Sequence, residues 1–168
     1  RARAMVSTSG TSIRQNLYEN WHYLPEPVRA HYVKRVAILG PESVGKSTMA
    51  KRLAEHFDTV WVEEYARQML DELVVAGERA SGEFRYEDLA TIAQGQHALE
   101  HSLVHLANKL LVTDTDVLTT MTWADRYYGR HEPWFEDIIQ SDQYDLTLVL
   151  RPEETVHVQD GSLSLIHI

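Results

Sequence analysis

Short runs rich in apolar residues alternate along the chain with longer segments in which apolar residues recur every three or four positions. The short runs predict strands that are buried on both faces. These strands are expected at 36–39, 59–62, 109–113 and 146–150. The longer segments predict amphipathic helices, which are expected at 45–57, 64–76, 86–108, 117–128 and 134–139. Strands that alternate with helices predict an α/β fold with a parallel sheet flanked by helices.

The first 33 residues have a different texture, because they combine aromatic and polar residues without sustained periodicity. A short helix is expected between Ser12 and Trp21, ended by the prolines at 25 and 27, since proline removes a backbone donor and disfavours helix before it. We therefore interpret residues 1–33 as a linker and the tail of an upstream domain. Residues 34–168 are predicted to form one domain.

Composition narrows the class of protein. The chain has 168 residues, with 16 Lys and Arg against 25 Asp and Glu, a net charge of −9. An acidic chain is a poor candidate for direct nucleic-acid binding. It has no cysteine, which excludes thiolate catalysis and cysteine-ligated metals. No apolar run approaches the roughly 20 residues that span a bilayer, so we expect a cytoplasmic protein without a membrane partner.

The run from Gly40 to Ser47 reads GPESVGKS and matches the pattern G-x-x-x-x-G-K-[ST]. The glycines let consecutive backbone N–H groups converge on phosphate oxygens, and the helix that follows adds its positive amino end. In this pattern Lys46 reaches the β- and γ-phosphates, and the Ser47 hydroxyl is a ligand of Mg²⁺. The position of the motif between an apolar strand and a helix predicts a nucleotide-phosphate site.

Carboxylates follow the second and third predicted strands. Parallel strands aim their carboxyl ends at one edge, where ligands bind. Phosphoryl transfer needs a carboxylate for Mg²⁺, a group for the acceptor hydroxyl and a cation for the transferred charge. Asp114 suits the metal, Glu64 suits the acceptor, and Arg67 with either Arg126 or Arg130 suits the phosphate charge.

Structural alternatives remain open for these residues. Glu64 would alternatively have a purely structural role at the start of a helix, where its negative charge stabilises the helix dipole. Asp116 would alternatively serve as the N-cap of a helix. The arginines would alternatively form surface ion pairs. The stripe of His97, His101 and His105 favours a solvated helix face over a metal site. The aromatic residues Trp123, Tyr127 and Tyr128 suit a base-stacking wall or core packing equally.

Four motifs in sequence order resemble a known family. They read VKRVAILGPESVGKSTMAKRLAEHF, EYAR, VTDTDVLTT and YYGRHEP. Together they resemble the ribosylnicotinamide kinase domain of the NadR family, over about residues 9–161. The prefix SGTSIR, from Ser9 to Arg14, resembles the end of a nicotinamide mononucleotide adenylyltransferase domain. The resemblance therefore implies an upstream nucleotidyltransferase domain in the full-length protein.

The resemblance implies a P-loop NTPase fold like that of nucleoside and nucleotide kinases. It implies that Mg·ATP phosphorylates the ribose 5′-hydroxyl of nicotinamide riboside to give nicotinamide mononucleotide. The implied ATP-phosphate ligands are Gly40, Pro41, Glu42, Ser43, Val44, Gly45, Lys46, Ser47 and Thr48. The implied catalytic groups are Lys46, Glu64, Arg67 and Asp114, with Ser47 and Asp114 at Mg²⁺. The implied substrate contacts are Glu64, Tyr65, Asp116, Trp61, Tyr128 and Arg130.

Two departures from the family pattern stand out. Glu63 occupies a position where some members carry Trp, and Trp61 shares its strand face, so Trp61 is the expected nicotinamide contact. After Asp160-Gly161 the family continues with an Arg-bearing lid, a last strand and a helix, whereas this chain ends in SLSLIHI. We expect a kinase domain that lacks its last strand. Two other functions remain open: a P-loop kinase for another small acceptor, and an ATP-binding regulatory module.

Overall fold

Four parallel strands form the sheet, in the spatial order β2-β3-β1-β4. The computed structural model describes residues 9–152. The strands are β1 (Lys34–Leu39), β2 (Trp61–Val62), β3 (Leu110–Asp114) and β4 (Leu146–Val149). The α/β class and the parallel sheet predicted from the apolar runs are confirmed. The prediction of burial on both faces is wrong for the edge strand β4, where Leu146 and Val149 are exposed. The ending SLSLIHI and the expected loss of a last strand lie outside the described residues.

The register brings the carboxyl ends of three strands to one edge of the sheet. Strand β3 lies between the other two, with Asp114 opposite Ile38 of β1 and Thr113 opposite Val62 of β2. Beyond the last pair, the Thr115 amide donates to the Ile38 carbonyl over 3.1 Å. The phosphate loop after β1 therefore lies beside the segments that follow β2 and β3.

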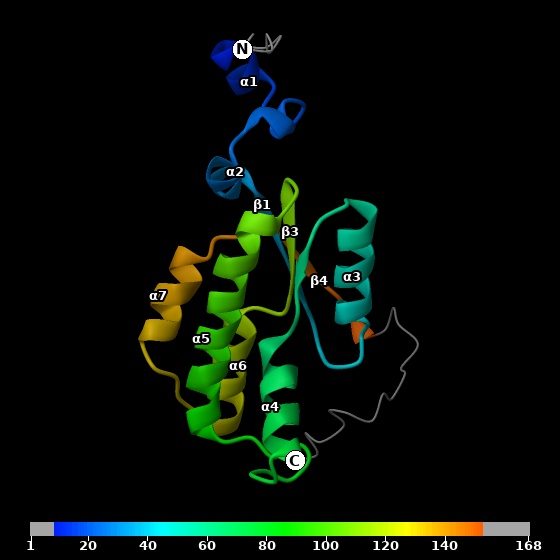
Figure 1. Cartoon of the computed structure of the whole chain (residues 1–168). Coiled ribbons are helices and arrows are strands. Elements are labelled where there is room, and N and C mark those ends of the chain that lie inside the picture. The colour runs from blue at the N-terminus through cyan, green and yellow to red at the C-terminus, as the bar shows by residue number, and fades with distance from the viewer. Residues whose placement is uncertain (1–8, 153–168) are drawn as a thin grey trace.

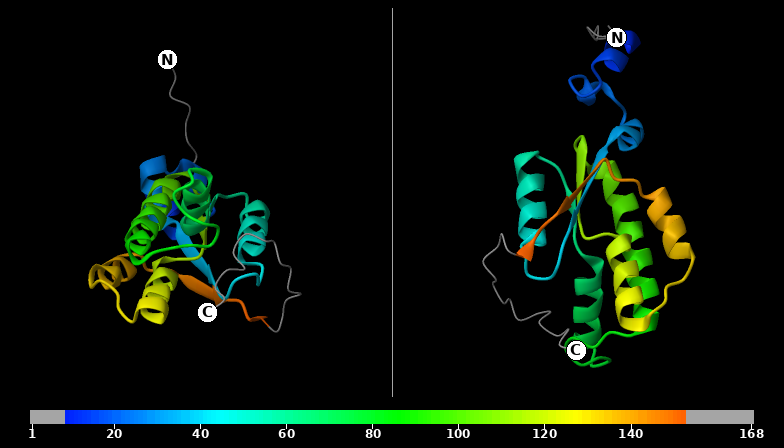
Figure 2. Two further views of the ribbon diagram at one scale, coloured as in Figure 1. Left: turned by 90° about the horizontal axis from the view of Figure 1, so that it is seen from below. Right: turned by 180° about the vertical axis from the view of Figure 1, so that it is seen from behind.

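Helices cover both faces of the sheet, as Figures 1 and 2 show. Helix α3 (Lys46–His56) lies on one face and packs closely through Ala50 and Ala54, both buried. The other face carries α5 (Tyr86–Leu103), α6 (Val117–Tyr128) and α7 (Trp134–Ser141). Helix α4 (Tyr65–Val75) leaves the carboxyl edge of the sheet and contacts α5. The helix expected over 86–108 ends at Leu103 and is followed by the 3₁₀ turn η2 (Val104–Leu106).

The amino-terminal segment forms α1 (Gly10–Gln15), the 3₁₀ turn η1 (Trp21–Tyr23) and α2 (Glu26–Tyr32). The helix predicted between Ser12 and Trp21 is wrong at its carboxyl end, because α1 ends at Gln15. The Asn20 side chain donates to the Asn16 carbonyl over 2.9 Å and so satisfies a group beyond that end. The prolines begin α2 rather than end a helix, since the first helical turn needs no backbone donors.

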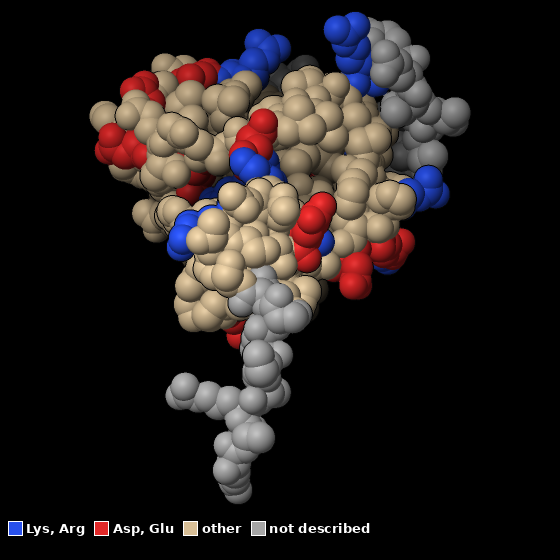
Figure 3. Space-filling view, turned by 90° about the horizontal axis from the view of Figure 1, so that it is seen from above, with Lys and Arg blue, Asp and Glu red and all other residues tan. Residues whose placement is uncertain are grey.

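This amino-terminal segment packs on the end of the sheet opposite the phosphate loop (Figure 1). Trp21 and Leu24 are buried in one cluster with Val62, Val104 and Leu111. The boundary predicted at residue 33 stays a prediction. Figure 3 looks onto this end of the molecule, where basic and acidic side chains are scattered among uncharged areas and touch one another at several points. Among the described residues, no helix has the length and apolar character to cross a bilayer.

Candidate functional site

The loop that follows β1 has the backbone conformation of a phosphate cradle. Gly40 (φ +145°) and Gly45 (φ +87°) adopt conformations that side chains disfavour. A Cβ on Gly40 would lie 2.6 Å from the Leu150 carbonyl, so glycine is required there on space as well. Gly45 leads directly into α3, whose positive amino end faces the loop. The Lys46 ammonium donates to the Pro41 carbonyl over 2.8 Å and so lies across the loop.

Asp114 ends β3 beside this loop and is 1% exposed. Burial raises the pKa of its carboxyl group, while a hydrogen bond with the Ser47 hydroxyl and the charge of Lys46 act in the opposite direction. Its Oδ1 atom is buried without a hydrogen-bond partner among the described residues. An unpartnered carboxylate oxygen beside a hydroxyl is a donor set that suits a hard divalent cation such as Mg²⁺.

Glu64 follows β2 and lies close to the same groups. Glu64 is buried, and burial raises the pKa of its carboxyl group. The positive charge of Lys46 lowers this pKa, and the negative charge of Asp114 raises it further. The Arg67 Nε atom lies 3.9 Å from Glu64 Oε2. Glu64 occupies the N-cap position of α4, yet its side chain makes no capping hydrogen bond. The structure thus brings Lys46, Glu64, Arg67 and Asp114 together at the carboxyl edge.

Asp116 is the N-cap of α6, which confirms the structural role that the sequence left open for it. Its Oδ1 accepts from the Thr119 amide over 3.0 Å and from the Thr119 hydroxyl over 3.2 Å. Burial raises the pKa of this carboxyl group, and the hydrogen bonds from Thr119 counteract that rise. Between the two aspartates, Thr115 adopts a left-handed backbone (φ +70°), a strain that concentrates at functional sites. The predicted substrate contact of Asp116 stays a prediction.

Gln96 is a site residue that the sequence did not reveal. Its Oε1 accepts from the Tyr65 amide over 2.9 Å, and its Nε2 donates to the Thr115 carbonyl over 3.3 Å. Gln96 is 2% exposed and so ties the segment after β2 to the segment after β3. The available signal was a polar residue on the inner side of a long apolar helix.

Tyr65 lies against α5 at Gly95. A Cβ on Gly95 would lie 2.2 Å from Cε1 of the Tyr65 ring. Alanine normally stabilises a helix by about 1 kcal/mol relative to glycine, but overpacking costs roughly 1–3 kcal/mol. We expect Gly95→Ala to lower the melting temperature, measured by circular dichroism. Gln94→Ala, at an exposed neighbour on α5, is the control. A melting temperature raised by Gly95→Ala would contradict the packing.

The remaining predicted residues lie elsewhere. Trp61 packs with Ile38, Ala50 and Val112 on the face covered by α3. The Tyr128 hydroxyl donates to the Phe84 carbonyl over 3.2 Å.

Arg130 lies over the Tyr86 ring, 4.4 Å from its centroid. Tyr128 ends α6, a helix of 12 residues that begins next to Asp116 and therefore spans about 18 Å. Tyr128 contacts Phe84 and Arg130 contacts Tyr86, and their substrate contacts stay predictions. Burial raises the pKa of the Tyr127 phenol, and the charge of Glu42 in the phosphate loop adds to that rise.

Comparison with known proteins gives a consistent picture. The AAA domain family matches residues 35–163. The chain is 37% identical to the trifunctional NAD biosynthesis/regulator protein NadR of Escherichia coli K12, and 36% identical to that of Salmonella typhimurium LT2. Each match covers 97% of this chain and 39% of the relative. The chain therefore spans well under half the length of these relatives.

Solved structures agree with the sequence comparison. A crystal structure of NadR in complex with NR superposes with a TM-score of 0.78 and 30% identity, over 90% of this chain and 42% of that one. A crystal structure of NadR in complex with NAD and AMP-PNP superposes with a TM-score of 0.71 and 31% identity, over 83% of this chain and 40% of that one. A thymidylate kinase from Ehrlichia chaffeensis superposes with a TM-score of 0.52 at 15% identity, over 71% of each chain, which shows a shared fold. The match to the AMP-PNP complex and the phosphate loop together support ATP binding.

Proposed function

Because the chain belongs to the AAA domain family and is homologous to NadR, we propose that it is a nicotinamide riboside kinase. It transfers the γ-phosphoryl group of ATP to the ribose 5′-hydroxyl and gives nicotinamide mononucleotide. The observation that carries the proposal is the likeness to NadR bound to NR over 90% of the chain. The cluster of Lys46, Glu64, Arg67 and Asp114 supplies the groups that phosphoryl transfer needs.

The position of each residue determines its proposed role in the transfer. The amides of the phosphate loop and the amino end of α3 bind the phosphates, and Lys46 neutralises charge on the transferred group. Glu64 accepts the proton of the ribose 5′-hydroxyl while the hydroxyl oxygen forms a bond to the γ-phosphorus. At the same time the bond between the γ-phosphorus and the β–γ bridging oxygen breaks, and ADP leaves. Burial raises the pKa of Glu64, and a carboxylate of higher pKa is a stronger general base.

Ser47 and Asp114 are the proposed ligands of Mg²⁺. The buried, unpartnered Oδ1 of Asp114 beside the Ser47 hydroxyl fits this cation. The ion, when bound, supplies charge neutralisation across the β- and γ-phosphates. Arg67, 3.9 Å from Glu64, is the proposed cation for the transferred phosphoryl group.

Substrate contacts from Tyr65, Asp116, Trp61, Tyr128 and Arg130 belong to the same proposal. So does a cytoplasmic location. The SGTSIR motif, in which Ser9 caps α1 by accepting from the Ser12 amide over 3.1 Å, supports an upstream nucleotidyltransferase domain in the full-length protein.

The acceptor is tested by comparing kcat/KM for nicotinamide riboside with the values for other nucleosides and for thymidine monophosphate, under saturating Mg·ATP. We expect nicotinamide riboside to exceed every other acceptor by at least about tenfold. A higher value for another acceptor would assign the site to a different P-loop kinase. Saturable ATP binding without transfer to any acceptor would favour the regulatory module.

A further inference from the structure

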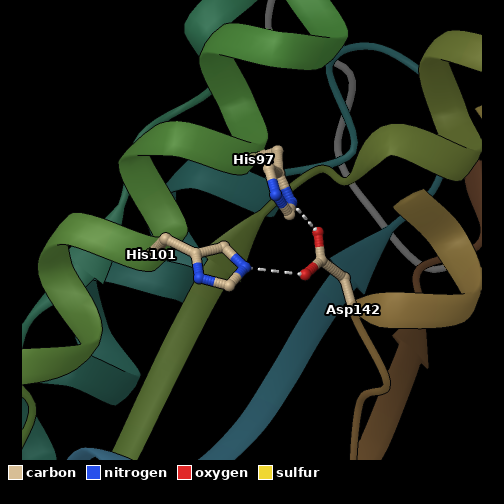
Figure 4. A group of neighbouring side chains, drawn as sticks. All are labelled: His97, His101 and Asp142. Atoms are coloured by element: carbon tan, nitrogen blue, oxygen red, sulfur yellow. Dashed lines mark hydrogen bonds and ion pairs between the residues drawn. The ribbon is translucent and has the colours of Figure 1, made fainter. Parts of the chain in front are cut away.

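A second polar cluster lies on α5, toward the amino end of the sheet and away from the phosphate loop. His97 and His101 occupy positions i and i+4, so both side chains lie on one face of α5. Their rings are 4.3 Å apart between centroids. Asp142, the C-cap residue of α7, lies between the two imidazoles, as Figure 4 shows.

The contacts of Asp142 define the cluster. Its Oδ2 lies 2.5 Å from His97 Nδ1, and its Oδ1 lies 3.2 Å from His101 Nε2. The Asp142 side chain is 3% exposed, whereas those of His97 and His101 are 31% and 53% exposed. One ligand atom from each of the three residues lies within 4.8 Å of the others.

We propose that His97, His101 and Asp142 bind a divalent first-row transition ion, of the class of Zn²⁺ or Co²⁺. Two imidazoles and one carboxylate are the donors that these ions prefer, and they leave positions open for water. Ligand atoms on one such ion lie about 3.3 Å apart. The Asp142–His101 pair already has that spacing, and the Asp142–His97 pair needs to open by less than 1 Å.

The surroundings are compatible with an added cation. Arg35 Nη1 lies 3.5 Å from Asp142 Oδ1 and 3.7 Å from Glu100 Oε2, so its positive charge is shared between two carboxyl groups. Each oxygen of Asp142 lies beside one imidazole, Oδ2 at His97 and Oδ1 at His101, so the carboxylate can bind the ion through both oxygens. The exposed imidazoles provide the entry path that a metal site requires.

Binding would join two elements that are distant in sequence. His97 and Asp142 are 45 residues apart, and Asp142 begins the connection from α7 to β4. That connection already docks on the sheet, because the Asp145 amide donates to the Arg35 carbonyl over 2.9 Å. A bound ion would fix α5 to this connection and raise the melting temperature. The inference is independent of the proposed kinase activity.

The test is titration of the protein with Zn²⁺ by calorimetry, with Mg²⁺ in large excess to occupy hard-cation sites. We expect one equivalent to bind. Loss of a single outer-shell partner weakens metal sites by about 10–100-fold, so His97→Ala and His101→Ala, each of which removes a direct ligand, should weaken binding by at least about 100-fold. His105→Ala is the matched control, because it removes an exposed histidine from the same stripe outside the cluster.

A second readout uses Co²⁺, whose visible absorption reports imidazole coordination. We expect the wild-type protein and His105→Ala to give the same band, and His97→Ala and His101→Ala to lose it. Equal Zn²⁺ affinity in all four proteins, or no stoichiometric binding by the wild type, would overturn the proposal. The cluster would then be a hydrogen-bonded contact between α5 and α7 only.

Discussion

Replacing Lys46 with alanine is expected to lower kcat/KM for phosphoryl transfer by about 10³-fold or more. Groups that stabilise charge on the transferred phosphoryl group contribute on the order of 10³–10⁵ in rate. The ammonium of Lys46 lies across the phosphate loop, bound to the Pro41 carbonyl, and the positive charge of Lys46 acts on Glu64 and Asp114. Steady-state production of ADP in the presence of acceptor measures the loss.

The control is Lys51→Ala, which removes an exposed lysine from the same helix outside the loop. We expect it to retain wild-type activity and melting temperature. If Lys46→Ala and Lys51→Ala lost activity equally, the loss would reflect net charge rather than the phosphate site.

Asp114→Asn is expected to lower kcat by about 10³-fold while the protein keeps its fold. The substitution preserves shape but removes the charge that the proposed Mg²⁺ site needs, and metal-ion stabilisation is worth several kcal/mol of the barrier. Burial makes the charged form of Asp114 costly and raises its pKa, so its neutral analogue should leave the melting temperature unchanged or raised.

The measurement is kcat as a function of Mg²⁺ concentration, together with a thermal melt. Asp145→Asn serves for comparison, because Asp145 is a half-exposed partner of Lys34 at the other end of the sheet. A fall in kcat accompanied by an unchanged Mg²⁺ dependence would show that Asp114 acts on something other than the metal.

The fold and the position of the candidate site followed from the order of elements along the chain. Apolar runs fixed the strands, and parallel strands place their carboxyl ends at one edge. Glu64 and Asp114 were therefore expected near Lys46, and the structure brings these side chains together. Their chemical roles stay predictions, because proximity alone does not assign a reaction.

Other features depended on tertiary contacts that periodicity does not encode. The stripe of His97, His101 and His105 predicts a solvated helix face, because nothing in the sequence places Asp142 beside it. The end of α1 depended on the side chain of Asn20, four residues beyond Asn16. On α6, Tyr127 lies within electrostatic reach of Glu42 in the phosphate loop, whereas the Tyr128 hydroxyl donates to the Phe84 carbonyl.

Nicotinamide riboside is the proposed acceptor, and it receives the γ-phosphoryl group on its 5′-oxygen. The direct test incubates the protein with Mg·ATP and nicotinamide riboside, and identifies the product by mass and by phosphorus NMR. We predict nicotinamide mononucleotide in equal amount to ADP, with none from Lys46→Ala. A protein that binds ATP but forms no nicotinamide mononucleotide, while it phosphorylates another acceptor, would contradict the claim.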